Sequence, residues 1–281
     1  HADLGGDGAG GFQQVGLNAL HGGGVEATGI GAVAGLAGAA NAVVVLAKDT
    51  SSVNAGVGDD ATIITKGTGV AGPAVGDGSS LQVVASSDAT VGATGLGATV
   101  SAGAAVGAVV VNAEAKADVL AALGNKVNVS GDGNVSVKAT RGAALGTGAG
   151  VSAAATAGAG GIYFAANAAV ANAGDNSVTR ALVGNDVVIG SHGDFIVAAD
   201  STTRQDAQAT GITIGGLALG AAVANASSDT RTIAAIGDRI SGTHAGTTAD
   251  PLQMMGKLAV TANGNDSNLA STFAGSGGLI S

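Results

Sequence analysis

The chain has 281 residues, a formal net charge of −9, 51 glycines, two prolines and no cysteine. Hydrophobic residues reach 46% but are mostly alanine and valine, because aromatic residues make up 2% and tryptophan is absent. The acidic balance and the lack of aromatic platforms argue against nucleic-acid binding. The absence of cysteine excludes disulfides and thiolate metal sites, and the low charge content argues against disorder. Small apolar side chains suit a thin core between closely spaced sheets.

The first predicted element is the uncharged segment TGIGAVAGLAGAANAVVVLA, residues 28–47. It is long enough to span a bilayer as a helix, and GAVAG (31–35) matches the small-xxx-small pattern of membrane helices. However, it lacks an aromatic belt and flanking Lys/Arg asymmetry, and each glycine disfavours a water-exposed helix by about 1 kcal/mol. Three related segments follow, at 92–111, 146–170 and 209–224. We expect strands with both faces covered, with membrane helices and soluble helices as alternatives.

A Gly-Asp/Asn pair recurs in VNAGVGDDATI (53–63), VLAALGNKVNV (119–129), TRALVGNDVVI (179–189) and TIAAIGDRISG (232–242). The pairs are Gly58-Asp59, Gly124-Asn125, Gly184-Asn185 and Gly237-Asp238. Residues before each pair alternate with period two, as Val119, Ala121 and Leu123 do, which is typical of a strand with one wet face. Because glycine, asparagine and aspartate tolerate positive φ, each pair predicts a turn after its strand.

Two further anchors keep a regular spacing from these pairs. Twelve residues before each glycine stand Leu46, Asn112, Asn172 and Asn225. A strand-like segment follows each pair: LQVVA (81–85), VSVKA (135–139), FIVAA (195–199) and LAVTA (258–262). In the first and fourth copies it comes later, after the insertions 65–80 and 242–256, which hold the only prolines, Pro73 and Pro251. Such insertions belong in loops outside a regular coil.

The anchors predict four degenerate repeats in a single array. Their approximate bounds are 28–91, 92–145, 146–208 and 209–270, with 271–281 as the start of a further repeat. The residues from His1 onward resemble the remainder of an earlier copy, so we expect a chain cut from a longer array. Tandem short strands and tight turns predict an all-β fold, a parallel β-helix or β-solenoid. We expect each repeat to wind two to three rungs of roughly 20 residues, stacked about 4.8 Å apart.

Glycine and alanine in the uncharged segments suggest that the chain assembles. A Gly/Ala face is flat and permits close approach of sheets, as in steric zippers. We therefore expect copies of the chain to join into a fibre or lateral bundle through such a face. The candidate glycines are Gly31, Gly35, Gly103, Gly107, Gly158, Gly160, Gly215 and Gly216.

Two stretches, AVVVNAEAKADVLAALGNKVNVSGDGNVSVKAT (108–140) and ANAGDNSVTRALVGNDVVIGSHGDFIVAADST (171–202), resemble repeats of bacterial filamentous-haemagglutinin-like adhesins, especially the leukotoxin-type filamentous adhesins. The resemblance spans all four copies. It implies a secreted β-helical rod on the bacterial cell surface, which mediates adhesion or builds extracellular fibres and binds host or cell-surface glycans or proteins. It brings no catalytic residues. The first copy departs from the pattern at Leu46, and the two proline loops are additions.

Motifs for chemistry are weak. Asp77 and Asp132 lie in GDG turns (76–78 and 131–133) that could hold calcium, but plain Gly/Asp turns are the favoured interpretation. We expect no other cofactor and no enzyme activity. A carbohydrate-active β-helix enzyme or glycan-binding module is the alternative function; the enzyme needs two carboxylates about 5–10 Å apart in a groove. A glycine-zipper membrane-inserting protein is the second alternative, although we do not expect an integral membrane protein.

Overall fold

The computed structural model describes residues 3–4, 14–66, 79–142, 149–191, 193–241 and 256–279. All secondary-structure elements within these residues are strands, so the predicted all-β class is confirmed. The strands are β1 (Asp3–Leu4), β2 (Val15–His21), β3 (Gly24–Gly35), β4 (Gly38–Asp49), β5 (Ser52–Val57), β6 (Thr62–Lys66), β7 (Ser79–Ser87), β8 (Thr90–Ser101), β9 (Ala104–Ala115), β10 (Asp118–Leu123), β11 (Asn128–Asp132), β12 (Asn134–Arg141), β13 (Ala149–Asp175), β14 (Val178–Val183), β15 (Val188–Ser191), β16 (Phe195–Ser228), β17 (Arg231–Ile236) and β18 (Leu258–Gly277).

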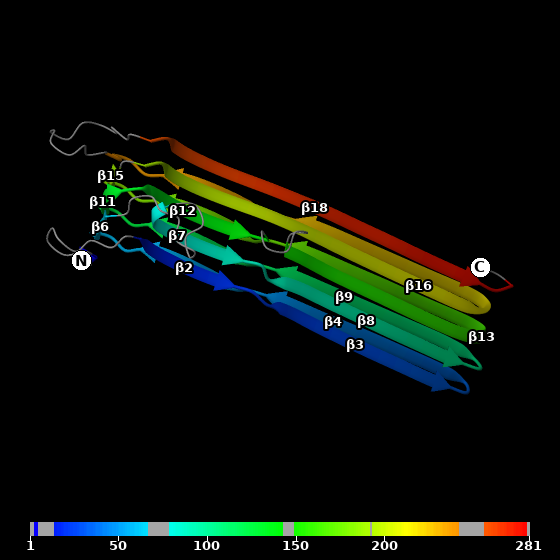
Figure 1. Cartoon of the computed structure of the whole chain (residues 1–281). Helices are drawn as coiled ribbons and strands as arrows, with labels where there is room; N and C mark the ends of the chain where they lie inside the picture. Colours follow the sequence, from blue (N-terminus) through cyan, green and yellow to red (C-terminus); the bar gives the residue numbers. More distant parts are fainter. Residues whose placement is uncertain are drawn as a thin grey trace.

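The strands stack in layers, and each layer uses one whole repeat. The strand pairings are parallel, and Val119 in β10 pairs with Val53 in β5 on one side and with Thr179 in β14 on the other. The four layers are β2–β6, β7–β11, β12–β15 and β16–β17, and β18 begins a fifth on β16. The expectation of two to three rungs per repeat is therefore wrong. Each layer is a single, long, flattened loop, and the layers lie side by side in Figure 1.

One end of every layer, here called the arm, consists of two facing sheets. In the first layer β3 runs outward, the chain turns at 36–37, and β4 runs back against β3. In the third and fourth layers the long strands β13 and β16 pass through this turn, and the pairing register shifts between Gly161 and Phe164. We define the arm as residues 24–49, 90–115, 149–175, 203–228 and 266–277.

The arm core is thin because valine packs against glycine. Val109 and Val111 of β9 face Gly95 of β8, where an added Cβ would lie 2.7 Å from Val109 and 2.6 Å from Val111. Gly29 of β3 meets Val43 and Val45 of β4 in the same way. In the third layer, the residues that face each other across the core, such as Ala155 and Ala171 of β13, are alanine on both sheets. The buried hydrophobic residues of the arm core are therefore only valine and alanine.

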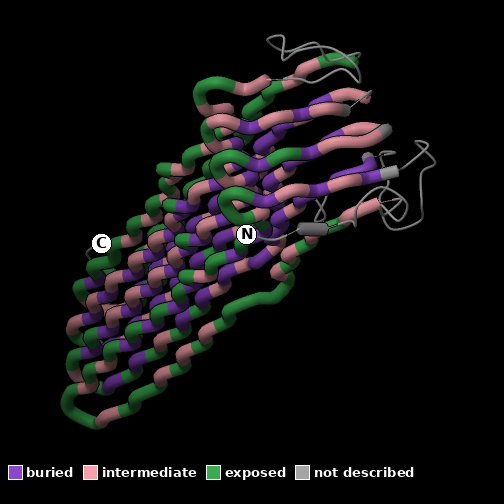
Figure 2. Tube along the Cα trace, turned by 90° about the vertical axis from the view of Figure 1, so that its left-hand side faces the viewer, coloured by how far each residue is buried: buried purple, intermediate pink, exposed green. Residues whose placement is uncertain are grey.

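The other end of every layer, here called the base, has three sheets around a wider core. One sheet continues the arm through β2, β7, β12 and the start of β16; β5, β10, β14 and β17 form the second, and β1, β6, β11 and β15 the third. Large side chains fill the space between them, among them Ile63, Leu81, Leu123 and Phe195. Inward and outward residues alternate along the strands in both regions, as Figure 2 shows.

The segment 28–47 forms β3 and β4 rather than a helix. No helix suited to crossing a membrane is found among the described residues. The expectation that both faces of these strands are covered is only half fulfilled within the chain. The inner face packs on the opposite sheet, whereas the outer side chains Ile30, Val44 and Leu46 are exposed.

Candidate functional site

The four Gly-Asp/Asn pairs stack on one another at a corner of the base. Asp59 Oδ1 accepts a hydrogen bond from the backbone N–H of Asn125 at 2.6 Å. Asn125 Oδ1 then accepts from Asn185 N at 2.9 Å, and Asn185 Oδ1 from Asp238 N at 2.8 Å. We call this series the first corner ladder. Each side chain accepts a hydrogen bond from a backbone N–H of the next layer. These carboxylates and amides therefore hold neighbouring layers together.

Three of the four glycines of this ladder, Gly124, Gly184 and Gly237, are required for close approach rather than for positive φ. Positive φ falls on the residue after each pair: Asp60, Lys126, Asp186 and Arg239. A Cβ added at Gly184 would lie 2.6 Å from the carbonyl carbon of Gly124, whereas one added at Gly58 would meet nothing within 4 Å. The predicted turn is present, but the conformational reason given for the pair was wrong.

The positive-φ residues carry charges that pair between layers. Arg239 donates from Nη2 to Asp186 Oδ2 at 2.7 Å and also from Nε to Oδ1. The hydrogen bond from Arg239 lowers the pKa of the Asp186 carboxyl below its ordinary value, and Lys126 contributes by its charge. This ion pair is solvent-exposed and therefore adds little to stability.

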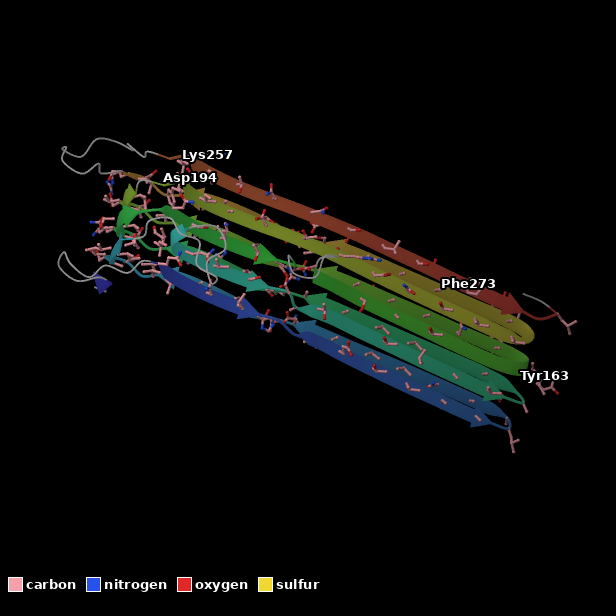
Figure 3. All side chains as sticks on the ribbon, viewed as in Figure 1. Tyr163, Asp194, Lys257 and Phe273 are labelled. Atoms are coloured by element: carbon pink, nitrogen blue, oxygen red, sulfur yellow. The ribbon has the colours of Figure 1, made fainter. Side chains whose placement is uncertain are left out.

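A second corner ladder was missed by sequence reasoning. Asn134 Oδ1 accepts from Asp194 N at 2.8 Å, and Asp194 Oδ1 accepts from Lys257 N at 2.7 Å. Figure 3 places Asp194 and Lys257 next to each other near the base corner. A glycine precedes each of these residues, at 133, 193 and 256. A detectable signal was present, because in the second and third repeats this second Gly-Asn/Asp pair follows the first at constant spacing.

The asparagine anchors lie on the outer surface of the arm. Asn112, Asn172 and Asn225 are in register on β9, β13 and β16, and Leu46 of β4 completes the row. Asn172 Nδ2 donates to Asn112 Oδ1 at 2.6 Å. The row is therefore a side-chain ladder along the stack, which stabilises the register of the layers.

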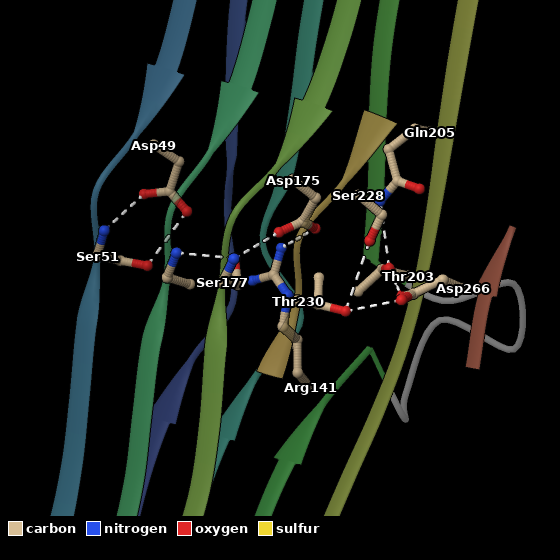
Figure 4. Close-up of polar contacts among 11 residues, drawn as sticks. Asp49, Ser51, Arg141, Asp175, Ser177, Thr203, Gln205, Ser228, Thr230 and Asp266 are labelled. Atoms are coloured by element: carbon tan, nitrogen blue, oxygen red, sulfur yellow. Dashed lines mark hydrogen bonds and ion pairs between the residues drawn. The ribbon is translucent and has the colours of Figure 1, made fainter. Parts of the chain in front are cut away.

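A polar wall separates the arm core from the base core (Figure 4). Arg141 Nη2 donates to Asp175 Oδ2 at 2.7 Å, and the side chains are 1% and 0% exposed. Asp175 Oδ1 also accepts from Ser177 N at 3.0 Å, and Asp49 caps Ser51 N in the same way. Toward the last layer the wall continues with Thr203, Gln205, Ser228, Thr230 and Asp266. These polar groups bond to one another, which indicates a structural role.

Sequence reasoning also missed polar groups inside the arm. Asn167 Nδ2 donates to the carbonyl oxygens of Ala157 at 2.9 Å and Ile212 at 2.6 Å. Asn41 Nδ2 donates to the carbonyl oxygen of Gly31 at 2.8 Å. These side chains link the two sheets of the arm across its thin core.

Most of the candidate assembly glycines do not lie on an outer face. Gly31 and Gly107 point into the arm, where an added Cβ would approach Val43 and Thr99 respectively. Only Gly158 and Gly160 lie on an outward row of the sheet. The remaining four surround the turn at the end of the arm: Gly35, Gly103, Gly215 and Gly216. The expected glycine face is thus corrected: six of its eight members are needed for internal packing or for the turn.

The calcium candidates gain no support from the described residues. Asp77 lies outside them, and of Asp132 only the backbone, at the end of β11, is described. Pro73 and Pro251 also lie outside the described residues. No group of three or more histidines and carboxylates suited to a metal ion occurs in the part of the chain that the structure describes.

A shallow groove on the outer face of the arm contains Glu26, Arg204 and Asp206. Glu26 and Asp206 occupy the same outward row but are separated by the strands of Gly92 and Ser152. Three layer spacings place their strands about 14 Å apart. Paired glycosidase carboxylates lie about 5–10 Å apart, so this groove lacks the pair that the carbohydrate-active alternative requires.

Scans of the chain against protein-family models, curated proteins and solved structures gave no match. The resemblance to filamentous-haemagglutinin-like repeats therefore stays a prediction from the sequence.

Proposed function

We propose that the chain is a non-enzymatic structural segment of an extracellular adhesive fibre on a bacterial surface. In this proposal the stacked layers form a β-solenoid, and copies of the chain associate. The observation that carries the proposal is the use of the polar residues. The two corner ladders, the asparagine row and the polar wall direct carboxylates and amides to neighbouring protein groups, whereas enzymes aim such groups at a pocket.

The layered arrangement suits a load-bearing rod. Interstrand backbone hydrogen bonds of a parallel stack run along the stacking axis, and the paired strands of every layer contribute them. Pulling along this axis therefore loads many bonds together. The thin, dry arm core and the ladders hold the layers in register, so each layer templates the next.

Adhesion requires an exposed surface, and the arm provides one on both sides and at its end. Tyr163 projects at the end of the arm, and Phe273 lies on an outer face (Figure 3). Within the proposal, a host or cell-surface glycan or protein binds such a surface, as the sequence resemblance implies.

Electron microscopy of the purified chain and immunogold labelling of intact producing cells test the proposal. We expect rods or filaments in the first experiment and surface label in the second. Label confined to the cell interior would contradict it. Release of reducing sugar from a panel of polysaccharides would favour the carbohydrate-active alternative instead; we expect none.

A further inference from the structure

The turns at the far end of the arm form one row across the stack, here called the tip. The strands enter these turns in register, because Ser101 pairs with Gly35 on one side and with Gly161 on the other, and Gly161 also pairs with Gly215. The layers therefore end at the same level, and their turns lie side by side in Figure 1. The tip consists of residues 36–37, 102–103, 162–163, 216 and 278–279.

Large apolar side chains project from the tip into solvent. Leu36 is 91% exposed and Leu279 is 96% exposed. Between them, Ile162 is 65% and Tyr163 is 75% exposed, and Figure 3 places Tyr163 at the very end of the arm. A groove beside these side chains is lined only by uncharged residues, of which Ser101 is the one polar member. Exposed apolar residues gathered in this way mark a contact with another protein or with a membrane.

The arm carries no charge near the tip. Its segments 27–47, 89–113, 149–174, 207–228 and 267–279 contain no charged residue. The nearest charges in the sequence, Glu26 and Asp206, stand ten residues before the tip, which is roughly 30 Å along an extended strand. At 0.1 M salt the Debye length is about 10 Å, so these charges are screened from anything that touches the tip. A partner at the tip is therefore held by apolar contact.

The tip is too small for a stable protein interface. Four layer spacings of about 4.8 Å and a sheet separation of about 10 Å give it roughly 200 Å² in projection. Stable protein–protein interfaces bury about 800 Å² on each partner. A lipid bilayer demands no complementary shape, and binding to its surface scales with the apolar area that is buried. The size of the tip therefore favours reversible binding to lipid over a protein partner.

The backbone of the tip also suits a partly apolar environment. Ala102 N donates to the carbonyl oxygen of Gly35 at 3.2 Å, so the turn of the second layer is bonded to that of the first. Tyr163 N donates to the carbonyl oxygen of Gly103 at 3.2 Å and joins the third layer to the second. Backbone groups without a partner are costly in hydrocarbon. Hydrogen bonds between neighbouring turns therefore lower the cost of shallow insertion.

We propose that the tip inserts into the surface of a phospholipid bilayer. Leu36 and Ile162 enter the upper part of the acyl chains, and Tyr163 lies at the level of the headgroups, where tyrosine is enriched in membrane proteins. Insertion by about 5–10 Å leaves most of both flat faces of the arm in water, and no strand crosses the bilayer. This inference goes beyond the proposed function, whose surface partner is a glycan or a protein. It does not rest on a fibre, because one copy presents the whole tip.

Tyrosine fluorescence tests the insertion directly, because Tyr163 is the only tyrosine and the chain has no tryptophan. Phosphatidylcholine vesicles whose acyl chains are brominated near the headgroup should quench the emission about twofold or more. Vesicles without bromine should protect Tyr163 from quenching by iodide in solution. Unchanged emission with brominated vesicles at millimolar lipid would overturn the proposal.

Two matched variants separate insertion of the tip from other modes of binding. Ile162→Asp places a carboxylate at the tip and should weaken co-sedimentation with phosphatidylcholine vesicles about tenfold. The control is Val44→Asp on a flat outer face of the arm, because Val44 and Ile162 are both 65% exposed. It should bind as the unaltered chain does, and far-UV circular dichroism and thermal melting check that both variants fold. Equal loss of binding in the two folded variants would show that the arm lies flat on the vesicle and would refute insertion of the tip.

The lipid composition gives a third readout. Because the nearest charges lie about three Debye lengths from the tip, replacing about 30% of the phosphatidylcholine by phosphatidylserine should change binding less than about twofold. A stronger dependence on anionic lipid would contradict the proposal, since a charged region would then be the binding site. Self-association in the absence of lipid that Ile162→Asp abolishes would contradict it as well, because the tip would then bind protein.

The outcomes for the tip and for the fibre are independent. Filaments that do not bind vesicles would support the proposed function and refute this inference. Vesicle binding by chains that form no filaments would uphold this inference and count against the fibre.

Discussion

The base and the arm belong to the same continuous layers, yet they enclose cores of different width. Three sheets surround the base core, which requires Phe195, Leu81 and Ile63 to fill it. Two sheets face each other in the arm, and valine against glycine fills the narrower gap. The comparison shows that the low aromatic content of the chain reflects the length of the arm. Four predictions test this contrast.

Truncation of the largest side chain of the base should have the largest effect. Phe195 is fully buried, so Phe195→Ala should lower the free energy of unfolding by about 3–5 kcal/mol. Val109→Ala in the arm removes two methyl groups and should cost about 2 kcal/mol. Phe273→Ala is the control, because Phe273 is 59% exposed and should have almost no effect. Urea denaturation measures all three; an arm variant that costs more than the base variant would contradict the contrast.

Breaking the polar wall between the two regions should rank second. Asp175→Ala leaves the buried Arg141 guanidinium without a described acceptor and should cost about 3 kcal/mol. The exposed pair of Arg180 and Asp118 is the control, and Asp118→Ala should cost less than about 1 kcal/mol. The double variant Arg141→Met/Asp175→Leu should recover much of the lost stability in the same denaturation experiment. Equal losses of stability in Asp175→Ala and Asp118→Ala would show that the buried ion pair of the wall stabilises the fold no more than the exposed pair does.

Adding a methyl group at the base corner should have an intermediate effect that depends on the layer. Gly184→Ala forces the backbones of two layers apart and should cost about 2 kcal/mol. Gly58→Ala occupies the equivalent position of the first layer, where space is open, and should be nearly neutral. Thermal melting distinguishes the two. A neutral Gly184→Ala would show that the layers are less closely spaced than described.

Adding a methyl group inside the arm should have the smallest effect. Gly95→Ala brings a Cβ against the methyl groups of Val109 and Val111, and should cost about 1 kcal/mol because side chains yield more readily than backbone. Val111→Ala in the same chain should relieve part of this cost, which a double-mutant cycle by urea denaturation measures. Gly160→Ala meets open space and serves as the control. Strict additivity of the two substitutions would contradict valine-on-glycine packing.

Period-two alternation and the Gly-Asp/Asn pairs were sufficient to predict the base strands around these pairs, the alternation of their side chains and the corner turns. They could not predict the number of layers per repeat. The outer turns of the arm occur at places such as Ser101–Ala104 and Gly161–Phe164, where glycine and alanine continue on both sides. Because alternation gives no signal for where a strand reverses, the length of each layer was invisible in the sequence.

The candidate assembly residues failed for a related reason. Glycine on a strand is equally compatible with a flat outer face and with a valine on the facing sheet. Only the pairing of β3 with β8 and the packing of β4 against them showed that Gly31 points inward. The outer face is instead rich in alanine and valine, which the sequence also contained but which alternation alone could not assign to a side.

The distance between equivalent residues of the first and fourth layers tests the central claim, one layer per repeat. Asn54 and Ile233 are outward, exposed and in register through Leu120 and Arg180. Nitroxide labels at Asn54→Cys and Ile233→Cys, read by dipolar EPR, should report attachment sites three layers or about 14 Å apart. Two or three rungs in each repeat would place them about 29–43 Å apart, and that result would contradict the account.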